Sequence, residues 1–146
     1  MIFLRGVWAF LYLCILIMVA GKDCKTKKIE NRYHIIMICL GMVSLWLYPE
    51  YNMMDRLIGT VIVSIPMLIV TIIVSGAFGG GDIKLMAVNG FLLGWKSVIN
   101  AMVMGVFSAG IYCVYMLMIH KINRKDRFSF GPFLALGLSV TLYNRF

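Results

Sequence analysis

Two aspartates stand at the edges of long apolar segments, where a carboxylate is chemically unusual. Asp82 follows three glycines, Gly79, Gly80 and Gly81, and directly precedes an apolar run. Asp23 comes two residues after the first apolar run of the chain. Ionisable residues at or near membrane depth are costly to place and are usually functional. These two aspartates are therefore the first candidates for chemistry.

A pair of aspartates can carry out the chemistry of an aspartic peptidase. One carboxylate, ionised, takes a proton from the attacking water, and the other, protonated, hydrogen-bonds the scissile carbonyl. Because two close carboxylates do not both ionise easily, the pair shares a proton and titrates as a unit. The glycines before Asp82 would let an extended substrate backbone come close to the acid.

The residues of this region also have structural interpretations. Asp82 could cap the N-terminus of a helix, and Asp23 could be a solvated loop residue among lysines. Asn89 lies two helical turns beyond Asp82 on the same face, where it could hydrogen-bond the site or another helix. Lys84 points away from Asp82 in a helix, toward lipid phosphate or toward a substrate.

The elements that must hold these residues are expected to be membrane helices. Of the 146 residues, 62% are hydrophobic and 14% are charged, whereas a soluble domain is about half apolar and about a quarter charged. One small soluble core cannot hide that much apolar surface, so the lipid bilayer is the expected solvent. The net charge of +8 is concentrated in two short segments between apolar runs. This pattern is typical of loops facing anionic lipid, and no nucleic-acid partner is predicted.

The cysteines give no sign of a metal site or a disulfide framework. None of the four is part of a C-x-x-C pair: Cys14, Cys24, Cys39 and Cys113. Three of them lie within apolar runs, where a reduced cysteine is a small apolar side chain. The sequence therefore predicts neither disulfides nor a zinc site.

Six apolar runs can be counted along the chain, at 2–21, 33–48, 57–76, 83–94, 97–119 and 128–143. A membrane-spanning helix needs about 20 residues, and the fourth run, with twelve, would reach only about 18 Å. A break between the fourth and fifth runs is predicted at the GWK sequence of 94–96. Pro66 predicts a kink in the third run. Gly105 and Ala109, four residues apart, predict a close helix–helix approach.

The distribution of basic residues favours six spans over five. The first basic loop holds five Lys or Arg residues and the second holds four. If the fourth run spans the bilayer, both loops and Lys84 share one side, which then carries ten of the fourteen Lys and Arg residues. The positive-inside rule makes that side cytoplasmic. We therefore predict an all-α polytopic bundle of six transmembrane helices in a single domain, 1–146, with both termini outside and Asp23 and Asp82 at the cytoplasmic face.

Three motifs, in order along the chain, resemble one family of membrane proteases. GGGD at 79–82 matches the G-x-G-D motif of membrane aspartic peptidases, and the longer GGGDIKLMAVNGFLLG is similar to type IV prepilin peptidases. DCKTKKIEN at 23–31 resembles that family's D-x-x-x-x-x-[IL]-P-[ND]. Asp23, Ile29 and Asn31 match it, and Glu30 stands where proline is usual. FSFGPFLALG at 128–137 resembles the segment that opens the family's last helix.

The resemblance implies a membrane-embedded aspartic endopeptidase that removes the short basic leader from type IV prepilin-like precursors, whether pilins, pseudopilins or tight-adherence pilins. Asp23 and Asp82 would be the catalytic pair. The residues expected to bind substrate or support the site are Gly79, Gly80, Gly81, Lys84, Asn31 and Asn89. The expected location is the inner membrane of a prokaryote. No metal or cofactor is implied.

The chain resembles the short form of the family, which lacks the N-terminal cysteine-rich methyltransferase segment, and methylation is not expected. The sequence specifies neither the individual substrate nor an oligomeric state.

Two other functions stay open at this stage. A proton-coupled transporter subunit would use Asp23 and Asp82 as a proton relay and would need further polar residues within the spans. The obvious polar residues there are Ser64, Asn89, Asn100 and Ser108, and no acid lies in the middle of a span. A non-catalytic pilus-assembly scaffold would bind pilins without cutting them. Its sequence support is Glu30 in the place of proline.

Overall fold

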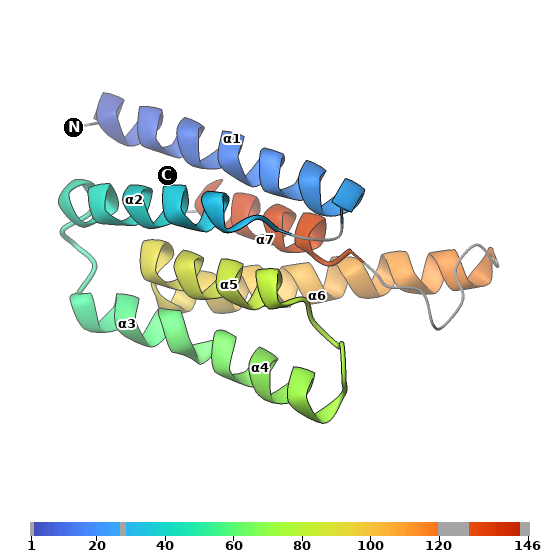
Figure 1. The fold of residues 1–146 in the computed structure, drawn as a ribbon. Coiled ribbons are helices and arrows are strands. Elements are labelled where there is room, and N and C mark those ends of the chain that lie inside the picture. The colour runs from blue at the N-terminus through green and yellow to red at the C-terminus, as the bar shows by residue number, and fades with distance from the viewer. Residues whose placement is uncertain (1, 27–28, 120–128, 144–146) are drawn as a thin grey trace.

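Helices make up most of the part of the chain that the computed structural model describes, which is residues 2–26, 29–119 and 129–143 (Figure 1). In chain order these helices are α1 (Ile2–Thr26), α2 (Asn31–Leu47), α3 (Met53–Ile62), α4 (Ser64–Ile73), α5 (Gly80–Leu93), α6 (Trp95–Met118) and α7 (Gly131–Tyr143). Within these described ranges the chain contains no β-strand, so the predicted all-α class is confirmed. The second basic segment, 121–127, lies outside the described residues, as do Lys27, Lys28 and Phe128.

The short helix α5 lies at the centre of the bundle, between α2 on one side and α3 on the other (Figure 1). It packs against α2, α3, α4, α6 and α7. The buried residues of α5 are Asp82, Leu85, Met86, Asn89, Gly90, Leu92 and Leu93. A helix that is enclosed by other helices has its polar groups satisfied within the protein. The central position of α5 therefore explains how the fourth apolar run can be shorter than the other runs.

The outer surface of the bundle is apolar, as expected of a protein that lipid surrounds. Phe3, Ile73 and Phe107 are 82%, 75% and 71% exposed, and exposed apolar surface on this scale does not suit contact with water. Three helical stretches are long and apolar enough to cross a membrane, Phe3–Thr26, Met53–Ile73 and Trp95–Met118, and α2 and α7 are shorter apolar helices. The chain is therefore a helical membrane protein.

The first helix is longer than its apolar run. We predicted that the helix would end near Gly21 and leave Asp23 two residues beyond it, but α1 continues to Thr26 and Asp23 lies in its last turn. The prediction of the helix end is wrong because lysine and threonine replace apolar residues here without breaking the helix. Thr26 also donates its hydroxyl to the Lys22 carbonyl at 2.9 Å, within the same helix.

The two predicted interruptions occur in the structure. The third run is divided into α3 and α4 at Val63, three residues before Pro66. A proline ring clashes with the carbonyl four residues earlier, and α3 ends at that residue, Ile62. Between α5 and α6 the chain turns at Gly94, whose φ of 80° lies in the left-handed region that favours glycine.

Glycines let pairs of helices in the bundle touch through their backbones. A Cβ atom added to Gly90 of α5 would lie 1.9 Å from the carbonyl oxygen of Gly59 of α3. A Cβ atom added to Gly137 of α7 would lie 2.2 Å from the Ala101 carbonyl oxygen of α6. The predicted close approach at Gly105 is also present, since its Cβ would lie 3.1 Å from the Leu134 side chain.

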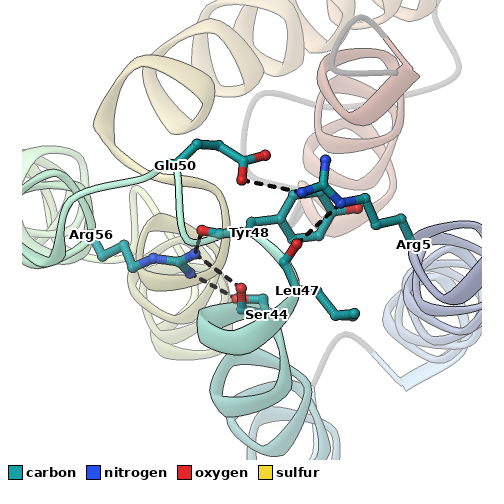
Figure 2. A network of polar contacts seen from close by, with 6 residues as sticks. All are labelled: Arg5, Ser44, Leu47, Tyr48, Glu50 and Arg56. Atoms are coloured by element: carbon teal, nitrogen blue, oxygen red, sulfur yellow. Dashed lines mark hydrogen bonds and ion pairs between the residues drawn. The ribbon is translucent and has the colours of Figure 1, made fainter. Parts of the chain in front are cut away.

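A buried arginine connects the C-terminal ends of α2 and α5. Arg56 is 1% exposed. Its Nη1 group donates to the Ser44 hydroxyl at 2.7 Å and to the carbonyls of Phe91 and Leu92. Its Nη2 group donates to the carbonyls of Ser44 and Tyr48 (Figure 2). The last carbonyls of a helix lack partners within the helix and carry partial negative charge, so the guanidinium satisfies both ends at once.

Arg5 of α1 joins the same end of the bundle from the other side of Tyr48 (Figure 2). It donates to the Leu47 carbonyl at 3.1 Å and forms an ion pair with Glu50 at 3.2 Å. Its guanidinium also lies over the Tyr48 ring, 4.8 Å from the ring centre. This basic residue, which interrupts the first apolar run, is thus paired at the end of the bundle.

Candidate active site

The ends of four helices define the region around the two aspartates. The C-terminal end of α1 and the N-terminal ends of α2, α5 and α7 lie at one end of the bundle, on the right in Figure 1. Asp23 belongs to the last turn of α1, and Asp82 to the first turn of α5. Their exposed fractions are 5% and 6%. Two carboxyls distant in sequence are therefore buried at the same end of the bundle.

Asp23 is held by the segment that begins α7. Its Oδ2 atom accepts a hydrogen bond from the Ser129 hydroxyl and a second from the Gly131 N–H group at 3.0 Å. A Cβ atom added to Gly131 would lie 2.6 Å from that oxygen, so a glycine permits the contact. The N-terminus of a helix carries partial positive charge and free N–H groups, which stabilise a carboxylate there.

Asp82 folds back onto the residue that precedes its helix. Gly79 donates its N–H to Asp82 Oδ2 at 3.3 Å. Asp82 is the third residue of α5 and not its N-cap, which is Gly79, so the predicted capping position is wrong. Its carboxylate still caps the helix, because it accepts the N–H of the N-cap residue. Among the described residues, its other oxygen, Oδ1, is buried and accepts no hydrogen bond. A buried polar atom without a partner is costly and requires a functional or structural explanation.

The two acids influence each other electrostatically. Asp82 precedes the fourth apolar run and lies outside the predicted spans. Burial and the negative charge of Asp23 raise the pKa of Asp82 to about 7, while the hydrogen bond from Gly79 lowers it in part. A carboxyl with this raised pKa can take up or release a proton near neutral pH. The negative charge of Asp23 acts in the same direction as burial, because it disfavours a second charge on Asp82.

The three glycines before Asp82 have different surroundings. A Cβ atom added to Gly81 would lie 2.9 Å from the Cβ of Ile29, and one added to Gly79 would lie 3.1 Å from Asp82 Oδ2. A Cβ atom on Gly80 would meet no other atom within 4 Å. A side chain at Gly81 would therefore force Ile29 to shift, one at Gly79 would press on the Asp82 carboxyl, and Gly80 is the glycine that faces open space.

Comparison with known proteins identifies the family to which the chain belongs. The family model described as the type IV leader peptidase family matches residues 10–114, a range that includes both aspartates. The chain belongs to this leader peptidase family. It is also 28% identical, over 135 residues, to a prepilin leader peptidase/N-methyltransferase of Bacillus subtilis (strain 168). The match covers 92% of this chain and 54% of that relative, so the chain spans about half the relative's length. No solved structure shows a significant match.

Two other predicted residues of this chain lie together at the surface of the site. Lys84 Nζ of α5 donates to Asn31 Oδ1, at the first residue of α2, over 3.4 Å. Glu30, at the position where the family usually has proline, pairs with Lys22 at 2.7 Å. This hydrogen bond and the charge of Lys22 lower the pKa of Glu30. An ion pair thus links the end of α1 to the start of α2.

Asn89, the remaining predicted residue, lies deeper in the helix bundle. It is fully buried, and its Oδ1 atom accepts a hydrogen bond from the Tyr12 hydroxyl of α1. Its amide group donates to the Leu85 carbonyl at 2.7 Å. The structure therefore gives Asn89 the second of its two predicted uses, a hydrogen bond to another helix. A role in the chemistry of the site stays a prediction.

Two residues that contact the aspartate region are absent from the predicted set. Ser129 binds Asp23, and His34 of α2 lies 3.1 Å, measured from Nε2, from the Gly81 carbonyl oxygen. Helical spacing was a usable signal for His34, because it shares a buried face with Met37 and Gly41. Ser129 precedes the glycine and proline that open the last helix, a region where hydroxyls commonly cap. Within the described ranges, no three His, Cys, Asp or Glu side chains gather as metal ligands.

Proposed function

We propose that this chain is an aspartic endopeptidase in which Asp23 and Asp82 form the catalytic pair. The observation that carries the proposal is the burial of both carboxyls at one end of the bundle, with exposed fractions of 5% and 6%. The charge of one raises the pKa of the other. Perturbed carboxyls of this kind are typical of functional sites. Membership of the leader peptidase family supports the same chemistry, and we propose 1–146 as one peptidase domain.

The proposed reaction is hydrolysis of a peptide bond by water. The ionised carboxylate takes a proton from water as the water oxygen attacks the scissile carbonyl. The second carboxyl, which is protonated, gives its proton to the carbonyl oxygen. When the tetrahedral intermediate collapses, the C–N bond breaks and the leaving amine takes the proton that the base had received. Two carboxyls that share one proton can return to their starting state after each cycle.

We further propose that the substrate is a prepilin-like precursor with a short basic leader. The support is the relative in Bacillus subtilis, which is named a prepilin leader peptidase. The proposed site of cleavage is the cytoplasmic face of a prokaryotic inner membrane. Ten of the fourteen Lys and Arg residues would lie on the side of the two aspartates, as the positive-inside rule requires of a cytoplasmic side.

The test is cleavage of a co-expressed prepilin-like substrate in membranes, read as a gel shift and by N-terminal sequencing of the product. Asp23→Asn and Asp82→Asn keep the side-chain shape and remove the charge. Asp55→Asn is the matched control, because Asp55 begins α3 at the other end of the bundle, where its Oδ1 accepts the Trp95 indole N–H at 3.0 Å.

The expected result is cleavage at the leader junction by the wild type and by Asp55→Asn, and none by the other two variants, all inserted equally. Wild-type rates in both Asp23→Asn and Asp82→Asn would overturn the aspartic mechanism. A wild type that binds the substrate and never cuts it would instead favour the pilus-assembly scaffold.

A further inference from the structure

The two carboxyls differ in the hydrogen bonds that they accept. Asp23 Oδ2 accepts two, from the Ser129 hydroxyl and from the Gly131 N–H at 3.0 Å. Asp82 Oδ2 accepts one longer bond, 3.3 Å from the Gly79 nitrogen. Asp82 Oδ1 is buried and, among the described residues, has no donor. The pair is therefore asymmetric although the residue type is the same.

This asymmetry favours a different protonation state for each member. Hydrogen bonds from donors stabilise the ionised form of a carboxyl, and the N-terminus of α7 adds partial positive charge beside Asp23. A buried oxygen without a donor is less costly when its group is a neutral acid. A protonated Asp82 also has an O–H group that can be donated to a substrate carbonyl.

We propose that Ser129 is a positioning residue that holds Asp23 as the ionised general base, so that Asp82 carries the shared proton and acts as the general acid. This inference rests on the proposed peptidase function and assigns the two roles that the function requires. Both bonds to Asp23 end on Oδ2, so within the described residues Oδ1 accepts none and is the oxygen that remains to take a proton from water.

The step balances with one proton on the pair. Water gives a proton to Asp23 and forms the new C–O bond, while Asp82 gives its proton to the carbonyl oxygen. On collapse, the C–N bond breaks, the proton on Asp23 moves to the leaving amine, and the hydroxyl of the intermediate returns its proton to Asp82. Several other ionisable groups of the described residues lie at this end of the bundle. They are Lys22, Cys24 and Lys25 on α1, Arg32, Tyr33 and His34 on α2, Glu30 directly before α2, and Lys84 on α5.

The proposal predicts how a variant without the hydroxyl responds to pH. In Ser129→Ala the ionised form of Asp23 loses one of its two donors, so a higher pH is needed to reach the active state of the pair. The acidic limb of the kcat/KM profile should move upward by about one pH unit, and kcat/KM on that limb should fall about tenfold. Above the limb, activity should approach the wild-type value. Ser129→Thr keeps the hydroxyl and should restore the wild-type profile.

The experiment uses the purified full chain in detergent, a prepilin-like substrate with a basic leader, and kcat and KM measured across the pH range. Ser139→Ala is the matched control, because Ser139 lies on α7, the helix that Ser129 precedes, and its hydroxyl donates within that helix to the Ala135 carbonyl at 2.7 Å. Its profile should equal that of the wild type.

Two results would overturn the assignment. One is a Ser129→Ala variant whose acidic limb is unchanged or moves downward. The other is loss of activity at all pH values in both Ser129→Ala and Ser129→Thr while Ser139→Ala is active, since a hydroxyl would then not be what matters. Asp23→Asn and Asp82→Asn in the same assay separate the two proposals. If both are inactive and Ser129→Ala is unshifted, the peptidase proposal stands and the assignment of roles fails. If both cleave at the wild-type rate, the peptidase proposal itself fails.

Discussion

His34 of α2 lies 3.1 Å, measured from its Nε2 atom, from the carbonyl oxygen of Gly81, the residue directly before Asp82. The other ring nitrogen, Nδ1, lies 3.3 Å from the carbonyl oxygen of Glu30. The side chain is 6% exposed. Both ring nitrogens face carbonyl acceptors, and a neutral imidazole donates from only one of them. The donor is assigned to Nε2, which makes the shorter of the two contacts. The imidazole thus connects the start of α2 to the turn that positions Asp82.

We expect loss of this contact to slow the chemical step. His34→Ala removes the donor to Gly81, so the turn before Asp82 loosens, and kcat should fall about tenfold with KM changed by less than about twofold. His34→Gln can present an amide donor near the position of Nε2 and should recover most of the loss. Steady-state kinetics on equally inserted variants would test this. Wild-type kcat in His34→Ala would exclude a positioning role.

The pH dependence of cleavage follows from the pKa of Asp82, which burial and Asp23 raise to about 7. If Asp82 must hold a proton to act as the acid, activity should fall as the pH rises above about 7. The pair must also have lost one of its protons for a base to be present, so activity should fall again at acidic pH. A bell-shaped profile of kcat/KM is expected. A profile that is flat from acid to alkaline pH would contradict the shared-proton mechanism.

The same raised pKa predicts a change in stability. The folded chain holds the Asp82 proton more tightly than the unfolded chain, so this group contributes most stability below about pH 4 and loses that contribution as the pH rises through about 7. Asp82→Asn resembles the protonated form and does not titrate. Its gain in thermal midpoint over the wild type should therefore increase between about pH 4 and pH 7 and stay constant above.

Thermal unfolding in detergent at several pH values would measure the effect. Asp23→Asn is the informative comparison, because it replaces charge-assisted hydrogen bonds from Ser129 and Gly131 with weaker neutral ones and should lower the midpoint. The prediction would be contradicted if Asp82→Asn were less stable than the wild type at alkaline pH. Burial of the ionised Asp82 would then not destabilise the folded chain.

Apolar periodicity and charge were sufficient to predict most of the fold. Each of the six apolar runs corresponds to a helix or, at Pro66, to a pair of helices, and Gly94 breaks the chain where predicted. The end of α1 was not predictable in this way, because the apolar pattern stops at Gly21 while the helix continues through lysines to Thr26. Hydropathy reports where lipid contact ends, and helix propensity decides where the helix ends.

The site was predictable only in part, for a physical reason. Asp23 and Asp82 stood out because acids are rare in this sequence and lie beside apolar runs. Their partners depend on tertiary contact: Ser129 is 106 residues from Asp23, and His34 is 47 residues from Gly81. No local pattern reports such distances. A serine or histidine also has many ordinary structural uses, so its type alone does not indicate a site.

The backbone contact between α3 and α5 makes a sharp prediction about packing. Gly90→Ala would place a Cβ atom 1.9 Å from the Gly59 carbonyl oxygen, so the two helices must separate, at a cost of about 3 kcal/mol or more. Gly110→Ala is the matched control, since a Cβ atom there meets nothing within 4 Å. Alanine in a helix is favoured over glycine by about 1 kcal/mol, so Gly110→Ala should be neutral or stabilising. The yield of folded protein and its thermal midpoint would test both. Equal midpoints for the two variants would contradict the contact.

The buried guanidinium of Arg56 predicts a loss of stability without a loss of chemistry. Arg56→Met removes the guanidinium donor from the carbonyls of Phe91 and Leu92 at the end of α5, at a cost of about 2–4 kcal/mol. The Tyr48 carbonyl keeps the Tyr51 N–H as a donor. Because α2 and α5 present their other ends to the aspartates (Figure 1), kcat per folded molecule should be unchanged. Arg5→Met, at a partly exposed ion pair, should lower stability less. Denaturation midpoints together with cleavage rates normalised to folded protein would decide. A reduced kcat in folded Arg56→Met would mean that α5 transmits a change at its C-terminal end to Asp82, two to three turns away along a helix that packs against five others.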